Sequence, residues 1–149
     1  MSDLRDRMVA LVAGQAHEDW RAGWQAEHGN EPRIKKTNDE TWSAAHDGAT
    51  ELDIAATAYD DLPSDWQGEN KAGAFVCVDA VLAQVSAQQP LDDAEFLESA
   101  AAEVHTAWVL RNPWAKDELK VSYAELPEEE KAKDRVGMRR AIEAYGNLA

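Results

Sequence analysis

Apolar residues recur every three to four positions in four long segments of the chain, as they do along one face of an amphipathic helix. The segments cover approximately residues 3–24, 63–84, 93–112 and 127–146. Pro63 and Pro127 open two of them, and proline is favoured at the first position of a helix because the amide that it lacks has no partner there. The pattern therefore predicts a mainly helical chain.

The stretch between the first two predicted helices is the least regular part of the sequence. Residues 33–37 and 51–54 are predicted as short strands, because β-branched and alternating residues occur there beside turn-forming ones. A short helix is expected to start at Thr37 or Asn38 and to stop at Gly48. We therefore expect a few short strands at most beside the helices.

Several polar residues mark the ends of elements in the second half. Residues 88–90, Gln-Gln-Pro, form a natural joint after the second helix, and Asp92 or Asp93 offers a carboxylate to cap the third. Residues 119–121 are predicted as a short extended segment, and Gly146 is expected to cap the end of the last helix.

Two landmarks occur twice along the chain. A His-x-x-Trp pair recurs at an offset of 88 residues, and a Tyr-x-x-Leu-Pro motif recurs at an offset of 64. The positions are His17, Trp20, Tyr59, Leu62 and Pro63 in the first copy, and His105, Trp108, Tyr123, Leu126 and Pro127 in the second. The offsets differ by 24 residues, so the first copy carries an insertion. We predict one domain, residues 1–149, with a repeat over about 3–87, an insertion within it over about 29–58, and a second repeat over about 91–148.

Composition narrows the setting of such a chain. A net charge of −14 repels nucleic acid polymers and anionic membranes, and no apolar run is long enough for a membrane span. The first residues lack the apolar core of a signal peptide, and one cysteine makes no internal disulfide. We expect a cytoplasmic protein without nucleic acid or membrane partners.

The residues that carry chemistry give little support for catalysis or metal binding. His17 and His105 each precede a tryptophan on a helix face, which is typical of a packed, hydrogen-bonded histidine, and neither has a second ligand at metal-binding spacing. Cys77 stands in an apolar run, where a thiol stays protonated. An enzyme with His46 or His105 as general base remains an alternative. No metal and no cofactor is expected.

Local groups of cations and aromatic side chains favour a binding function instead. Trp20 and Trp108 lie on apolar stripes and are expected in the core, whereas Trp24 and the other tryptophans stand at element ends, where they either stack on a flat ligand or close the core edge. The insertion brings together cations for a phosphate and rings for a base. The candidate ligand-binding residues are Arg33, Lys35, Lys36, Trp42, His46, Trp66, Arg111, Trp114, Lys131 and Arg135.

The second half, over roughly residues 94–147, resembles a ryanodine-receptor repeat. The resemblance lies in His105-Thr-Ala-Trp108 and in the stretch from Tyr123 through Leu126-Pro127 and Lys131 to Asp134-Arg135. Pro113-Trp114 replaces the family's Gly-Trp-x-x-Gly stretch, and in the first half Gln67, Asn70 and Lys71 replace the later Lys, Asp and Arg.

The resemblance implies a tandem pair of repeats packed with approximate twofold symmetry into one helical unit. It also implies a non-catalytic module, since the family serves as such in calcium-release channels, and some bacterial and phage members are proposed to recognise nucleotide-derived ligands. The motif residues and Asp134 then have structural roles, although ion pairs at Asp134 and Arg135 fit either a structural or a ligand-binding role.

Two hypotheses of different classes follow. The first is a module that recognises a small anionic or nucleotide-derived ligand. The second is a protein–protein or dimerisation module without a small ligand, in which exposed tryptophans and the acidic surface form the contact, as in a homodimer.

Overall fold

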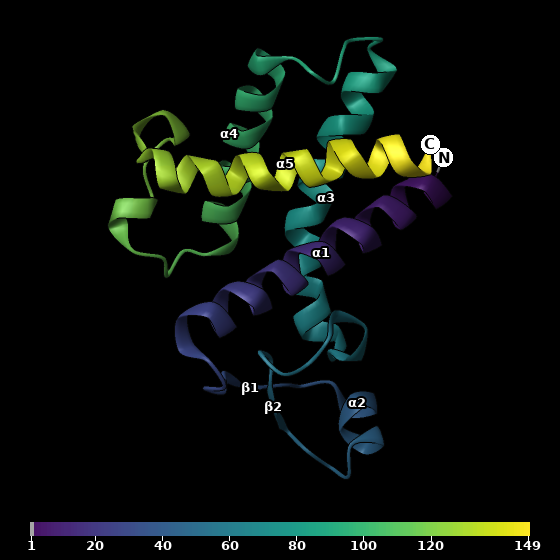
Figure 1. Cartoon of the computed structure of the whole chain (residues 1–149), viewed down its shortest axis with the longest axis vertical. Coiled ribbons are helices and arrows are strands. Elements are labelled where there is room, and N and C mark those ends of the chain that lie inside the picture. The colour runs from purple at the N-terminus through teal and green to yellow at the C-terminus, as the bar shows by residue number, and fades with distance from the viewer. Residues whose placement is uncertain (1) are drawn as a thin grey trace. The chain divides into compact units, whose positions relative to one another are not determined.

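A computed structural model describes residues 2–149 of the chain. Within this range the chain is mainly helical, with one small antiparallel sheet, which confirms the predicted class. The five α-helices are α1 (Ser2–His28), α2 (Glu40–Ala45), α3 (Ser64–Ser86), α4 (Ala94–Arg111) and α5 (Glu128–Leu148). The strands are β1 (Ile34–Lys36) and β2 (Glu51–Asp53), and the 3₁₀ turns are η1 (Tyr59–Asp61), η2 (Asp117–Leu119) and η3 (Tyr123–Glu125) (Figure 1).

The chain divides into two compact units, and both α1 and α3 contribute residues to each. Unit 1 contains the chain up to Val12 together with Ala72–Ala149, and unit 2 contains Ala13–Lys71. Neither boundary coincides with the predicted joint between repeats at residues 88–90. Arrangement as a single domain therefore remains a prediction.

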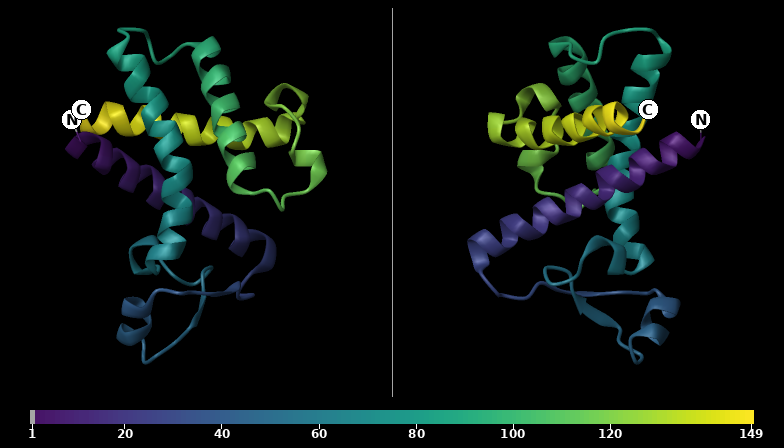
Figure 2. Two further views of the ribbon diagram at one scale, coloured as in Figure 1. Left: turned by 180° about the vertical axis from the view of Figure 1, so that it is seen from behind. Right: turned by 45° about the vertical axis from the view of Figure 1, so that its right-hand side comes forward.

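Unit 1 is built around α5, which crosses α3 and α4 (Figures 1 and 2). Met138 of α5 is fully buried, and a Cβ added at Gly137 would lie 3.2 Å from the Sγ of Cys77 on α3. Glycine at this position therefore allows the two helices to approach closely. The other buried apolar residues of unit 1 include Met8, Val9, Val12, Ala74, Val78, Val81, Ala100, Ala101, Ala141 and Ala144.

One ion pair and one N-cap stabilise the helices of unit 1. Arg5 donates from Nε to Asp79 at 2.7 Å, which ties the start of α1 to α3. Asp93 begins α4 by accepting a hydrogen bond from the amide of Glu95, as one of the two predicted caps. Burial raises the pKa of the Cys77 thiol to about 12, so the expectation that it stays protonated is confirmed.

Unit 2 contains the insertion, whose two strands pair antiparallel with Lys35 opposite Leu52. Asp39 begins α2 by accepting from the amide of Trp42, and it also accepts from the amide of Ser64 at the start of α3. These backbone hydrogen bonds, that from Ser64 first, hold the pKa of the Asp39 carboxyl below its usual value. One aspartate thus organises two helix starts.

Several local predictions are wrong. Residues 117–119 form the 3₁₀ turn η2 in place of an extended segment at 119–121. Gly146 is not a cap, because α5 continues through it to Leu148. The amide of Ala149 still donates to the carbonyl of Tyr145. Trp20 was expected in the core but is 38% exposed, since the polar side of α1 carries it together with Trp24.

Candidate functional site

In unit 1 the segment after α4 returns to the start of α5 (Figure 2). Residues of these elements line an open pocket. Its volume is about 280 Å³. The lining residues come from α4, η2, the end of the η3 turn and α5: His105, Trp108, Leu119, Leu126, Glu130, Lys133 and Asp134. Leu119 and Leu126 also pack with Ala101 and Tyr123, so the pocket borders the small apolar cluster that joins η3 to α4.

His105 is buried on α4, and its Nε2 lies 2.7 Å from the carbonyl oxygen of Val121. A carbonyl oxygen only accepts hydrogen bonds, so Nε2 carries the proton and, in the neutral ring, Nδ1 holds a lone pair. The imidazole stacks against the indole of Trp108 with 6.5 Å between centroids and 18° between planes. The prediction of a packed, hydrogen-bonded histidine is confirmed.

Asp134 lies one helical turn after Glu130 on α5, with its side chain only 16% exposed. The Nδ1 of His105 lies 3.9 Å from the carboxylate, which is beyond hydrogen-bond distance, and no group within residues 2–149 donates a hydrogen bond to the carboxylate. Burial raises the pKa of this carboxyl to about 6, with Glu130 adding to the rise and His105 and Lys133 opposing it. The pocket is therefore lined by a carboxylate that has no hydrogen-bond donor among the described residues.

Replacing Asp134 with asparagine is expected to stabilise the fold at pH 7 by about 1 kcal/mol, because a buried charge is removed. The stability contributed by the protonated carboxyl is complete below its ordinary pKa of 3.8 and is lost as the pH rises through about 6. The gain over the parent chain should therefore be smallest at pH 4 and largest at pH 7. Urea unfolding at several pH values measures it.

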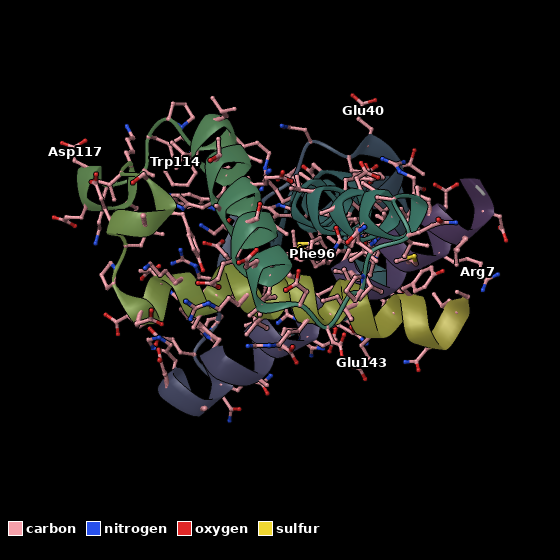
Figure 3. All side chains as sticks on the ribbon, turned by 90° about the horizontal axis from the view of Figure 1, so that it is seen from above. Arg7, Glu40, Phe96, Trp114, Asp117 and Glu143 are labelled. Atoms are coloured by element: carbon pink, nitrogen blue, oxygen red, sulfur yellow. The ribbon has the colours of Figure 1, made fainter. Side chains whose placement is uncertain are left out.

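Glu143→Gln is the matched control, since it removes one negative charge from an exposed position of the same helix (Figure 3). It is expected to change stability by less than about 0.5 kcal/mol at either pH. An equal gain for both variants would mean that the overall charge of the chain, not the environment of Asp134, is responsible.

Arg135 is held by two carboxylates of unit 1. Its guanidinium donates to Glu98 from Nε at 2.6 Å and from Nη2 at 2.7 Å, and to Glu128 from Nη1 at 2.8 Å. The Tyr123 hydroxyl donates to the same Glu98 at 3.1 Å. The Arg135 hydrogen bond is the main reason that the pKa of Glu98 is lowered. These contacts join α4, η3 and α5. They fit the structural role of Arg135 rather than the ligand-binding role.

A corner of the same local geometry occurs in unit 2. His17 places its Nε2 2.8 Å from the carbonyl oxygen of Thr57, two residues before Tyr59, as His105 does with Val121 before Tyr123. The ring of His17 stacks on Trp20 with 5.9 Å between centroids and the same 18° between planes. The prediction that His17 is packed and hydrogen-bonded is confirmed.

The two Tyr-to-Pro turns also agree in backbone conformation. Leu62 ends η1 with φ −70° and ψ 145°, and Leu126 ends η3 with φ −71° and ψ 149°. The carbonyl of Pro63 accepts from two amides of the first turn of α3, as the carbonyl of Pro127 does in α5. Each prolyl corner thus leads into a long helix in the same way.

The two corners differ in their polar groups. Asn70 stands at the position of Asp134, at the offset of 64, and donates to the carbonyl of its own helix residue Trp66. The hydroxyl of Tyr59 is buried without a hydrogen-bond partner in the described part of the chain, whereas that of Tyr123 has Glu98. A carboxylate without a hydrogen-bond donor in the described part of the chain is therefore a feature of the second corner.

Three tryptophans of unit 2, on α1, α2 and α3, donate hydrogen bonds to backbone carbonyls in or near the insertion. Trp24 donates from its indole to the carbonyl of Glu31 at 2.7 Å. Trp42 donates in the same way to Asp61 at 2.9 Å, and Trp66 to Lys36 at 2.9 Å. Each of these indoles thus hydrogen-bonds the backbone of another segment of unit 2.

The other candidate residues of unit 2 lie on or beside β1 and α2. Arg33 places its guanidinium 5.5 Å from the centroid of Trp24, and His46 stacks on Trp42 at 4.0 Å. Lys36 is exposed and Lys35 half-buried on β1. The rings of Trp42 and His46 are thus brought together, and Arg33 pairs with a tryptophan outside the predicted set.

The remaining candidates belong to unit 1. Arg111 is exposed at the end of α4, and Trp114 is 78% exposed in the segment that joins α4 to α5 (Figure 3). Lys131 lies with its ammonium 5.5 Å from the centroid of the Tyr123 ring. None of the three lines the pocket, whereas Trp108 and Asp134, expected to be structural, do.

Glu130 and Lys133, two further pocket residues, are not among the candidate ligand-binding residues. They form an ion pair of 3.0 Å on α5 and resemble a solvated helix face in sequence. Glu98 of α4, which accepts from Arg135, was also missed. Gly73 and Gly137 match at the offset of 64 and extend the repeat into the helices.

Within residues 2–149, no group of three or more His, Cys, Asp or Glu side chains is placed to hold a metal ion. The same part of the chain contains no helix with the length and hydrophobicity needed to cross a bilayer. Comparison with protein-family models, with curated proteins and with solved structures finds no match for this chain.

Proposed function

We propose that the chain is a non-catalytic binding module of two related helical repeats, similar to ryanodine-receptor repeats, which recognises a small nucleotide-derived ligand in the pocket of unit 1. The observation that carries the proposal is the Asp134 carboxylate, mostly buried at the pocket and without a hydrogen-bond donor among the described residues. Perturbed ionisable groups in concave sites are characteristic of ligand-binding sites.

The repeat part of the proposal is supported by the matched corners at His17–Tyr59 and His105–Tyr123, whose histidine hydrogen bonds and turn angles agree. An approximate twofold axis between the repeats remains a prediction. Superposition of the two corners and their helices in an experimental structure would test it.

Of the ligands expected from the sequence, a nucleotide fits this pocket better than a simple anion. Glu130 and Asp134 repel a negative group, and Lys133 is already paired with Glu130. A nucleobase instead brings a flat face for Trp108 and N–H donors for the carboxylate. Its phosphate would remain outside, in contact with solvent.

Titration of the full chain with a panel of nucleotides and cyclic dinucleotides is expected to change its tryptophan fluorescence at submillimolar ligand, because Trp108 lines the pocket. The response should disappear in Trp108→Phe and persist in Trp42→Phe, whose ring lies in the insertion region. A thermal shift for the same ligands checks that binding stabilises the folded chain.

Absence of any response at millimolar ligand would contradict a nucleotide-binding function. Loss of the response in Trp42→Phe alone would place binding in the insertion, at the cations and rings predicted from the sequence.

A protein–protein or dimerisation module is the second candidate, and one observation favours it. Leu110 and Trp114, four residues apart in unit 1, are each 78% exposed. Exposed apolar pairs of this kind occur at contacts between proteins. Light scattering of the parent chain and of Trp114→Ala separates the candidates, since only this one requires a dimer that the substitution dissociates.

A further inference from the structure

The pocket is lined by His105 and by the Asp134 carboxylate, which has no hydrogen-bond donor among the described residues. His105 uses its Nε2–H for the carbonyl of Val121, so the Nδ1 that faces Asp134 at 3.9 Å carries a lone pair in the neutral ring. At 3.9 Å the two groups make no hydrogen bond with each other. A ligand N–H donor placed at this point satisfies what the folded chain leaves open.

The walls of the pocket limit the shape of the group that enters. Trp108 and His105 contribute stacked rings, and Leu119 and Leu126 contribute apolar side chains. A volume of about 280 Å³ lies just below the usual range for a whole drug-sized ligand. The pocket therefore accommodates one small flat group, with the rest of the ligand outside it.

We infer that the pocket recognises a planar group in which one carbon carries two N–H donors, the Asp134 carboxylate accepting both and the Trp108 indole lying against its face. The inference rests on the proposed function and names the chemistry by which the ligand is held. A carboxylate accepts such a pair in parallel, with both oxygens used, and charged acceptors make the stronger hydrogen bonds. The guanine base and the guanidinium group share this donor pair.

Calorimetric titration of the full chain with GMP, AMP and agmatine tests the inference and distinguishes its two sources. GMP presents a donor pair on a base, agmatine presents it on a guanidinium, and AMP is a nucleotide without it. At least one of the two donor-pair compounds should bind at least tenfold more tightly than AMP, consistent with about 1.5–3 kcal/mol for hydrogen bonds to a charged group. Binding of GMP alone identifies the base, and binding of agmatine alone identifies the guanidinium.

Asp134→Asn is expected to weaken the preferred compound at least about tenfold, because an amide offers one acceptor oxygen where the carboxylate offers two. The control is Asp117→Asn, which removes an exposed carboxylate on η2 outside the pocket lining (Figure 3). It should leave the affinity unchanged. Circular dichroism of both variants checks that the helices are retained.

The outcomes separate this inference from the proposed function. Equal affinity for GMP, AMP and agmatine, or unchanged binding by Asp134→Asn, overturns recognition of a donor pair and leaves a binding module of other specificity. Binding of agmatine but of no nucleotide supports the donor pair and removes the nucleotide-derived ligand. Failure of every nucleotide and of agmatine removes both.

Discussion

Replacing Met138 with alanine is expected to lower the free energy of unfolding by about 2–5 kcal/mol, the range for large-to-alanine substitutions in a packed core. Met138 has no solvent exposure and lies next to Gly137, where α5 approaches Cys77 on α3. The long helices cannot close on the space that is left, so the cost of the cavity adds to the lost burial. Thermal unfolding should show a decrease in Tm on the order of 10 °C for a chain of this size.

Val136→Ala provides the control on the same helix, because Val136 is 39% exposed and its truncation leaves little cavity. Its expected cost is below about 1 kcal/mol. Similar losses for the two variants would mean that α5 does not bury Met138 in the way the structure describes.

Most of the fold was predictable from the sequence because its elements depend on local signals. Pro63 and Pro127 stand immediately before α3 and α5, one residue ahead of the predicted first helical position, and Asp93 caps α4 with its own carboxylate. The two-stranded sheet was predictable from two short β-prone runs. The errors arise where a residue is compatible with more than one local structure. Gly146 is compatible with a helix cap, but α5 continues past it to Leu148.

The pocket was predictable only in part, since it depends on contacts between distant elements. The sequence singled out His105, Trp108 and Asp134 as motif residues, but for a structural role. Lys133 and Glu130 carry no signal in an acidic helix start, where charges usually face solvent. Leu119 reaches the pocket through a 3₁₀ turn that the sequence does not specify.

Burial of the Asp134 carboxylate costs stability, and this cost is an argument for a function at the candidate site. A fold that only needed stability would place asparagine or an apolar residue there, as it does with Asn70 at the matched position of unit 2. Retaining a carboxylate whose pKa burial raises to about 6 is a local conflict of the kind that folds keep at functional positions.

His17→Leu and His105→Leu are expected to destabilise the chain by similar amounts, about 1–3 kcal/mol each. Each substitution removes the Nε2–H donor and leaves a carbonyl, of Thr57 or of Val121, without its partner at a buried corner. Leucine favours a helix and fills comparable volume, so the lost hydrogen bond dominates the effect. Urea unfolding of both variants at pH 7 measures the two costs.

His46→Leu serves as the control, because His46 is exposed on unit 2 and its ring bonds only to the carbonyl of Trp42 one turn earlier. Its expected cost is less than about 0.5 kcal/mol. A large loss for one buried histidine and none for the other would show that the two corners bear different loads, and it would contradict the proposal that they are related repeats. Comparable losses would support it, because two unrelated turns have no reason to depend equally on a histidine 40 residues earlier in one case and 16 residues earlier in the other.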